Sequence, residues 1–384
     1  MALRHLYGSV FCGVAISLAC LCATAQKPGA VAGSVVCTDT HTPCRYAEIK
    51  LQSVESFAHA KTGDPFRMSH ADYQKFQSHS YAVISGLDGS FQIEGVEPGD
   101  YYITAYLAGY LDASGLSYTQ AQIGSALTLA ELDKVLMRVA VSSGQTATAN
   151  LSLARGASLG GVMRYDDGGA ASNVNIYLYR KDASGDWKRY GDVLMFGQRM
   201  NAPKSTDDRG RFYIPGLPAG DYKLEANLPQ PFMTDTGRFS GKVAGLSTDG
   251  PASLRIYNGD KFRLRDAPPI ALKDGEERTD IGVEVRLSQL YTVQGNVSSV
   301  PNGYAITKGS VSLLDPEDGS TLREASFQSD GSFTFKLVAN GNYLLQIHAE
   351  ADSSGQPQRP YSRLKMPLLV EGDVIGLAYT VAAQ

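Results

Sequence analysis

The chain has 384 residues, of which 43% are hydrophobic and 19% charged, and its formal net charge is −4. This is the composition of a globular protein, so a largely disordered chain is excluded. The charge balance is mildly acidic and no local cluster of Lys and Arg occurs, which argues against a nucleic-acid partner. The length is sufficient for two or three domains.

The amino terminus has the pattern of an export signal. A positively charged start precedes an apolar core over residues 6–21 and the cleavage motif Ala-Thr-Ala at 23–25. We therefore expect residues 1–25 to be a signal peptide and the mature protein to be secreted, to the periplasm, the cell surface or the medium. No later apolar run is long enough to span a membrane. A lipid anchor at Cys20 or Cys22 remains an alternative.

The mature chain retains two of the five cysteines, Cys37 and Cys44. An even pair of cysteines in an exported protein predicts a disulfide. The residues between them are rich in turn formers, so the bond would close a connection between two strands. Two free thiols are the alternative.

One pattern occurs three times along the chain. In each copy a Gly stands two residues before a Phe, and a Tyr follows the Phe ten residues later. These landmarks are Gly89, Phe91 and Tyr101; Gly210, Phe212 and Tyr222; and Gly331, Phe333 and Tyr343. Repetition of this kind indicates a tandem array of similar domains.

Each copy also opens on a glycine that is followed by apolar residues at offsets of 2, 16 and 18. The four positions are Gly33, Val35, Ile49 and Leu51; Gly160, Val162, Ile176 and Leu178; and Gly295, Val297, Val311 and Leu313. Residues two apart on a strand point to the same face. We therefore expect the apolar members of each set to face a core.

Short alternating stretches separated by Gly, Pro, Asn and Asp predict an all-β fold. We expect three tandem immunoglobulin-like or prealbumin-like antiparallel β-sandwich domains after the signal peptide. Alternating strands close the first two copies, which places the domains at 26–154, 155–288 and 289–384. The Tyr of each copy is expected to be a tyrosine corner, with its ring buried and its hydroxyl bonded to nearby backbone.

The copies differ mainly in insertions at 52–80 and 230–277, whose roles the sequence leaves open. The second insertion is expected to form extra hairpins or an ordered loop. Residues 128–131 read Thr-Leu-Ala-Glu, a capping box ahead of helically spaced apolar residues, which predicts a short helix. Residues 69–76, in the first insertion, are compatible with another.

The framework G-x-V, I/V-x-L, D-x-x-G-x-F or D-G-S-F, and G-D-Y resembles the carboxypeptidase regulatory-like domain over roughly residues 29–384. The resemblance implies a β-sandwich similar to transthyretin-like and starch-binding-like domains, found as tandem modules in secreted bacterial proteins. It further implies a non-catalytic accessory role, in binding carbohydrate or another surface. The zinc carboxypeptidase that gives the family its name would need motifs such as H-x-x-E or H-E-x-x-H, and neither occurs.

No residue pattern indicates a reaction. The chain lacks a G-x-S-x-G nucleophile elbow. His59, His70 and His79 have no metal-ligand spacing, and the acidic loops lack the residue order of a calcium loop. We therefore expect no catalysis, no cofactor and no metal, with a hydrolase of unrecognised type as the alternative.

Aromatic residues provide the only lead to a ligand. The sole tryptophan, Trp187, lies in a segment that reads as a hairpin with a polar tip. If Tyr179, Trp187 and Tyr190 share its outward face, they form a platform for a sugar ring. The competing interpretation folds Trp187 back over the sandwich edge. We expect a protein that binds carbohydrate or another surface; a structural spacer and a protein-binding accessory factor of the cell envelope are the alternatives.

Overall fold

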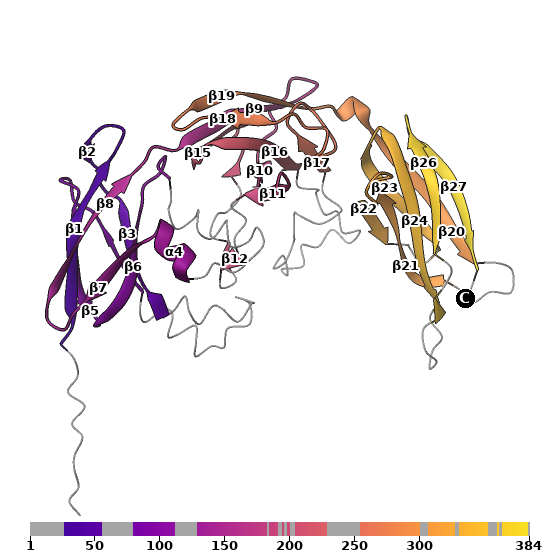
Figure 1. Ribbon diagram of the computed structural model, residues 1–384. Coiled ribbons are helices and arrows are strands. Elements are labelled where there is room, and N and C mark those ends of the chain that lie inside the picture. The colour runs from indigo at the N-terminus through magenta and orange to yellow at the C-terminus, as the bar shows by residue number, and fades with distance from the viewer. Residues whose placement is uncertain are drawn as a thin grey trace, which may run out of the picture.

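The computed structural model describes residues 27–55, 80–111, 129–182, 184–190, 194–195, 198–199, 204–228, 254–299, 306–326, 330–351, 359–360 and 363–382. Over these ranges the chain forms three successive β-sandwiches, coloured from indigo to yellow in Figure 1. The predicted all-β tandem fold is confirmed. The predicted signal peptide, the possible helix at 69–76 and parts of both insertions lie outside the described residues. None of the described helices is long and apolar enough to cross a membrane.

In the first sandwich, β1 (Gly29–Cys37) lies between β5 (Ser90–Val96) and β8 (Thr146–Leu153). The facing sheet has the strand order β4-β3-β6-β7. The other strands are β2 (Thr42–Pro43), β3 (Glu48–Ser53), β4 (Ser80–Ile84), β6 (Gly99–Tyr106) and β7 (Met137–Val141).

The short helix predicted after the capping box is confirmed as α4 (Leu129–Val135). Leu132 and Leu136 are buried with Val54 and Tyr102 in a small cluster of their own. The helix therefore covers the outward side of β6, away from the main core of the first sandwich.

In the second sandwich, β9 (Ala157–Tyr165) lies between β15 (Arg211–Leu217) and β19 (Glu277–Val285). The larger sheet has the order β11-β10-β16-β17, with β14 on β10 and β18 on β16. The strands of this sheet are β10 (Asn175–Lys181), β11 (Trp187–Tyr190), β14 (Lys204–Ser205), β16 (Gly220–Leu228), β17 (Leu254–Tyr257) and β18 (Ile270–Leu272). The short strands β12 (Leu194–Met195) and β13 (Gln198–Arg199) pair with each other in a separate ribbon. The described part of the second insertion thus adds β17 and β18 to the larger sheet.

The 3-10 helix η3 (Leu287–Gln289) leads into the third sandwich, where β20 (Leu290–Ser299) lies between β23 (Ser332–Ala339) and β27 (Val374–Val381). The facing sheet has the order β22-β21-β24, with β25 and β26 on β24. Its strands are β21 (Ile306–Leu314), β22 (Thr321–Ser326), β24 (Gly341–Ala351), β25 (Arg359–Pro360) and β26 (Leu364–Val370).

The smaller sheet of each sandwich is mixed, which the antiparallel prediction did not include. The last strand of each unit runs parallel to the first, in the pairs β1 with β8, β9 with β19, and β20 with β27. The last strand reaches this position by crossing from the facing sheet, which is how parallel neighbours are normally joined. Side chains alternate in the same way in both kinds of pair, so the sequence pattern does not reveal the strand direction.

A glycine on the first strand lies where this parallel strand passes closest. In each copy the glycine is also paired with the landmark Phe, as Gly33 with Phe91, Gly161 with Phe212, and Gly295 with Phe333. A Cβ atom on Gly33 or Gly161 would collide with a carbonyl group of the parallel strand, and one on Gly295 would lie 2.7 Å from a carbonyl oxygen. The position therefore excludes any side chain.

The register corrects the predicted opening of the second copy by one residue. The prediction placed Gly160 and Val162 there, but Gly161 occupies the crossing and Met163 is the fully buried residue. Val162 points to the opposite face, because a shift of one residue along a strand exchanges the two faces. The common offsets of 16 and 18 to Ile176 and Leu178 favoured Gly160 in the sequence, but the connection between the first two strands is one residue shorter in this copy.

The turn and corner landmarks have the same geometry in all three copies. The turn glycines have positive φ, at 76° for Gly89, 74° for Gly210 and 80° for Gly331. The tyrosine corners are confirmed: each hydroxyl donates to the carbonyl oxygen four residues earlier, Tyr101 to Glu97 at 2.8 Å, Tyr222 to Pro218 at 2.7 Å and Tyr343 to Ala339 at 2.8 Å. These bonds anchor the start of β6, β16 and β24.

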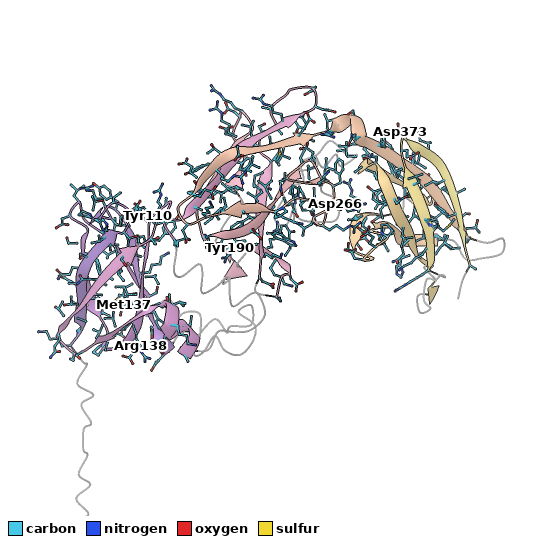
Figure 2. All side chains as sticks on the ribbon, turned by 45° about the horizontal axis from the view of Figure 1, so that its top comes forward. Tyr110, Met137, Arg138, Tyr190, Asp266 and Asp373 are labelled. Atoms are coloured by element: carbon cyan, nitrogen blue, oxygen red, sulfur yellow. A yellow bond between two sulfur atoms is a disulfide. The ribbon has the colours of Figure 1, made fainter. Side chains whose placement is uncertain are left out.

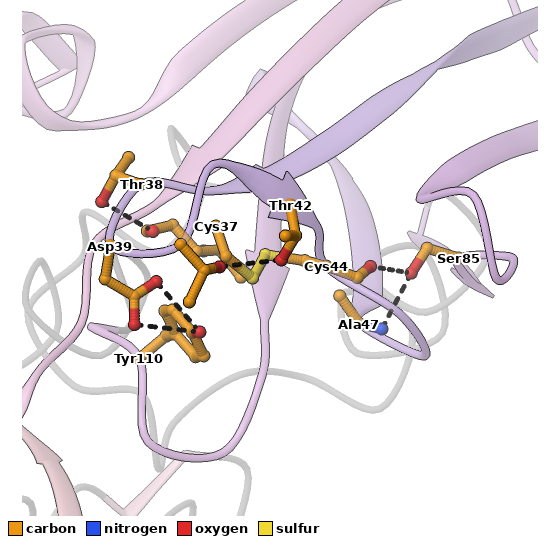
Figure 3. Close-up of a disulfide and its surroundings, with 10 residues drawn as sticks. Cys37, Thr38, Asp39, Thr42, Cys44, Ala47, Ser85 and Tyr110 are labelled. Carbon is orange, nitrogen blue, oxygen red and sulfur yellow. Dashed lines mark hydrogen bonds between the residues drawn. A yellow bond between two sulfur atoms is a disulfide. The ribbon is translucent and has the colours of Figure 1, made fainter.

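The predicted disulfide joins Cys37 and Cys44, whose Cα atoms are 5.3 Å apart (Figure 3). It ties β1 to β2, where Cys37 is paired with Thr42. Asp39, in the loop between the two cysteines, accepts a hydrogen bond from the Tyr110 hydroxyl at 3.1 Å. Tyr110, labelled in Figure 2, also forms a β-bridge with Arg155, which lies in the segment that leads into the second sandwich.

An ion-pair cluster connects the second and third sandwiches. The Asp315 carboxylate is 3.1 Å from Arg263 and 2.7 Å from Arg265. Asp315 is only 2% exposed, and the two guanidinium groups are its counter-charges. A cavity of about 60 Å³, lined by Arg263 together with Tyr257 and Tyr343, has room for a few water molecules.

We expect Gly161→Ala to lower the free energy of unfolding of the second sandwich by more than about 2 kcal/mol, because the Cβ atom would displace the backbone of β19. Gly282→Ala is the matched control on β19, since a Cβ atom there meets nothing within 4 Å. Its effect should stay within about 0.5 kcal/mol. Urea unfolding followed by the fluorescence of Trp187 measures both variants, and equal effects would contradict the explanation.

Tyr222→Phe should cost about 1–2 kcal/mol, because it leaves the buried carbonyl oxygen of Pro218 without its donor. Tyr106→Phe in the first sandwich is the control, since Tyr106 is 47% exposed. Thermal unfolding by circular dichroism compares the two variants. A melting temperature of Tyr222→Phe equal to that of the wild type would show that the corner bond contributes nothing to stability.

Candidate functional site

The three predicted ligand-binding residues do not share a face. The β10–β11 hairpin pairs Tyr179 with Arg189 and Lys181 with Trp187, so Tyr179 and Trp187 lie on the outward face of the larger sheet. Tyr190 is instead paired with Leu178 and packs on the core of the second sandwich. Its ring centroid is 5.7 Å from that of the corner residue Tyr222. A platform made of all three side chains is therefore wrong.

Trp187 lies under two lysine side chains. The Nζ atom of Lys223 is 4.7 Å from the centroid of the Trp187 ring, and that of Lys181 is 6.0 Å away. Lys223 also donates to the backbone oxygen of Leu264 at 2.8 Å. Burial lowers the pKa of Lys223. The indole ring thus belongs to a cation–π arrangement that fixes its position on the sheet.

Glu225 occupies the centre of the same outward face and is only 1% exposed. The Tyr179 hydroxyl donates to its carboxylate at 2.9 Å, and Arg189 and Arg255 approach it at 3.9 and 4.0 Å. Burial, followed by the charge of Glu225, raises the pKa of Tyr179. The tyrosine is therefore a neutral donor at physiological pH, and it holds the carboxylate in one orientation.

Further aromatic side chains complete this face. The Tyr257 and Tyr179 rings meet edge to face, with centroids 6.5 Å apart. The Arg189 guanidinium lies 3.5 Å from the centroid of Tyr177. We call the set formed by Tyr177, Tyr179, Trp187, Lys223, Glu225 and Tyr257, with the two arginines, the Glu225 cluster.

Most of this cluster is not predictable from the sequence. The alternation in β16 indicates that Lys223 and Glu225 face away from the core, and outward charges on a strand are normally solvated. Both are buried, at 4% and 1% exposure. Their partners come from β10, β11 and β17, so only the pairing of four strands reveals the cluster.

The acidic loops weighed as calcium sites have structural roles in the part of the chain that the structure describes. Asp167 accepts the backbone N–H of Gly169 and Asp318 that of Ser320, each at 2.8 Å, as expected of turn residues. Asp315 belongs to the arginine cluster between sandwiches. No group of His, Cys, Asp and Glu within the described ranges is arranged to hold a metal. His59, His70 and His79 lie outside those ranges.

Comparison with known proteins identifies partial relatives. The sequence matches no protein-family model. It is 24% identical over 221 residues to serine-aspartate repeat-containing protein D of Staphylococcus aureus strain Newman, which covers 53% of this chain and 16% of that protein. The same protein of strain USA300 also matches, at 24% identity over 53% of this chain and 15% of that protein. The chain therefore spans about 16% of the length of the curated relatives it matches.

Solved structures resemble the chain only loosely. A streptococcal ancillary pilin is 11% identical, covering 93% of this chain and 99% of its own, with a TM-score of 0.29. BcpA, the major pilin subunit of Bacillus cereus, is 9% identical, covering 93% of this chain and 100% of its own, with a TM-score of 0.22. Likeness at this level supports no conclusion about the function of this chain.

We expect Glu225→Gln to destabilise the second sandwich by about 3 kcal/mol or less, because it leaves two guanidinium groups without their buried counter-charge. The partial exposure of the arginines keeps the cost below that of a fully buried pair. Glu284→Gln is the matched control, since it breaks an exposed pair with Arg286 at 2.9 Å. Urea unfolding should show a change of less than about 0.5 kcal/mol for the control. Equal losses in both variants would contradict a structural role for Glu225.

Proposed function

We propose that this chain is an exported, non-catalytic protein that binds carbohydrate on the outer faces of its β-sandwich domains. In this proposal a signal peptide at 1–25 precedes domains at 26–154, 155–288 and 289–384. Three core clusters, each drawn from its own stretch of chain, support this division. The framework that resembles the carboxypeptidase regulatory-like domain supports an accessory role, as does the similarity to part of a repeat-containing protein.

The observation that carries the proposal is the Glu225 cluster. The outward face of a sheet that serves only to cover a core needs nothing beyond solvated polar side chains. Here aromatic rings, cations and a buried carboxylate are assembled on that face instead. Aromatic surface combined with directed polar groups is the chemistry that recognises a sugar ring. We propose that Tyr179 and Trp187 contact the ligand, while Tyr190 supports the hairpin from the core.

A structural spacer is the second candidate, favoured by the contacts between sandwiches. Asp315 with Arg263 and Arg265 ties the second unit to the third, and Tyr110 with Arg155 ties the first to the second. Such contacts would hold the units at fixed angles. A spacer of this kind predicts a rigid shape in solution scattering and no saturable binding to any glycan. A protein-binding factor of the cell envelope would instead retain a partner protein during purification from native membranes.

The mature wild-type protein should bind at least one polysaccharide on a glycan array, saturably and with an affinity that Trp187→Ala reduces by about tenfold. Tyr106→Ala is the control, because Tyr106 is an exposed strand tyrosine of the first sandwich. Melting curves verify that each variant is folded. The absence of saturable binding by the wild type would overturn the carbohydrate proposal. Unchanged affinity of Trp187→Ala would remove the Glu225 face from the binding site.

A further inference from the structure

The second sandwich has a groove on its opposite outer face, over the smaller sheet β15-β9-β19. Its volume is about 390 Å³, within the lower range of small-molecule sites. Gly160 and Gly161 line it from β9, Arg211 and Tyr213 from β15, and Thr279 from β19. All of these residues belong to the described part of the chain, and the groove shares none of them with the Glu225 cluster.

The shape of the groove depends on Gly160 of β9. This residue has no side chain, and Tyr213 of the neighbouring strand β15 lies against it. Gly160 is paired with Tyr213, and a Cβ atom on Gly160 would lie 3.2 Å from the ring atom Cδ2. The tyrosine ring therefore lies close to the backbone of β9. Tyr213 nevertheless remains 44% exposed, which leaves much of its surface open to a ligand.

The other two sandwiches show that the fold does not require this pair. The corresponding register positions hold Ala32 with Gln92 in the first sandwich and Gln294 with Thr334 in the third. The parallel strand β19 leaves no room for a side chain at Gly161. The position of Gly160 has no such requirement, because the other two sandwiches have a side chain there. A glycine facing an exposed aromatic residue is thus a feature of the second sandwich alone among the three.

Hydrogen-bond donors and an acceptor lie around the Tyr213 ring. The Tyr213 hydroxyl, the Arg211 guanidinium and the Thr279 hydroxyl are exposed and form no hydrogen bond with another described residue. Asp207 uses Oδ1 to accept the backbone N–H groups of Arg211 and Arg209, at 2.8 and 2.9 Å, and these bonds lower its pKa. Its other oxygen is left as an acceptor. Donors and an acceptor therefore border one aromatic surface.

We propose that this groove is a saccharide-binding site, in which Tyr213 stacks on a hexopyranose ring of a glycan. Arg211 and Thr279 would donate hydrogen bonds to the sugar, and the Asp207 carboxylate would accept one from a hydroxyl group. The exposed part of the Tyr213 ring provides contact area at little entropic cost. This inference rests on the proposed carbohydrate-binding function, to which it adds a second and separate site.

The test uses the complete mature protein and a panel of laminarin, soluble starch, dextran, chitohexaose and alginate, with affinities measured by titration calorimetry. Tyr213→Thr introduces the residue that the third sandwich has at this register position, Thr334. Arg211→Gln removes the guanidinium group, with its charge and its fork of N–H donors, from an exposed side chain and carries little risk for folding. Tyr106→Thr is the matched control, because Tyr106 and Tyr213 are exposed to 47% and 44%.

We expect Tyr213→Thr to weaken binding of at least one glycan by about tenfold or more, and Arg211→Gln to weaken it as well, while Tyr106→Thr leaves it unchanged. Trp187 emission verifies that the larger sheet is intact in each variant. Wild-type affinity in both groove variants would overturn this site and leave the proposed function standing. A wild-type protein that binds no member of the panel or of the array would overturn the proposed function itself.

Discussion

Each sandwich depends on one close approach between two backbones. The last strand of the unit crosses from the facing sheet and lies parallel to the first strand, over a glycine where no Cβ atom fits. The crossing buries the landmark Phe, which is paired with that glycine. The corner tyrosine then anchors the next strand through a bond to a backbone oxygen. The repeated landmarks are thus parts of one arrangement that closes the unit.

Once the unit is closed in this way, its outer faces are free to vary. The second sandwich uses both: the larger sheet carries the Glu225 cluster and the smaller sheet the groove at Tyr213. Burying the Glu225 carboxylate is costly, and the hydrogen bond from Tyr179 and the nearby arginines offset part of that cost. The proposed binding sites therefore lie where the second sandwich differs from the other two, and not in the framework that all three share.

Some features were predictable because they depend on residues close together in the chain. The tyrosine corners are bonds between residues four apart, and α4 follows from helical spacing after a capping box. The disulfide joins cysteines seven residues apart. The positions of Tyr190 and Glu225 were harder to predict. The face on which Tyr190 lies depends on the register of the β10–β11 pair, and the burial of Glu225 depends on side chains from three other strands.

The amino-acid sequence by itself determined the tandem β-sandwich class, the three repeats and the local anchors of each turn, because these follow from alternation and from short-range geometry. Tertiary structure alone decided the direction of the closing strand, the choice of Gly161 over Gly160, and the grouping of Tyr213 with Thr279 or of Arg255 with Glu225. The physical reason is that side-chain alternation is identical for parallel and antiparallel neighbours, and that the register of a strand is fixed by its pairing with strands that are distant in the sequence. Only contacts between distant strands distinguish these arrangements.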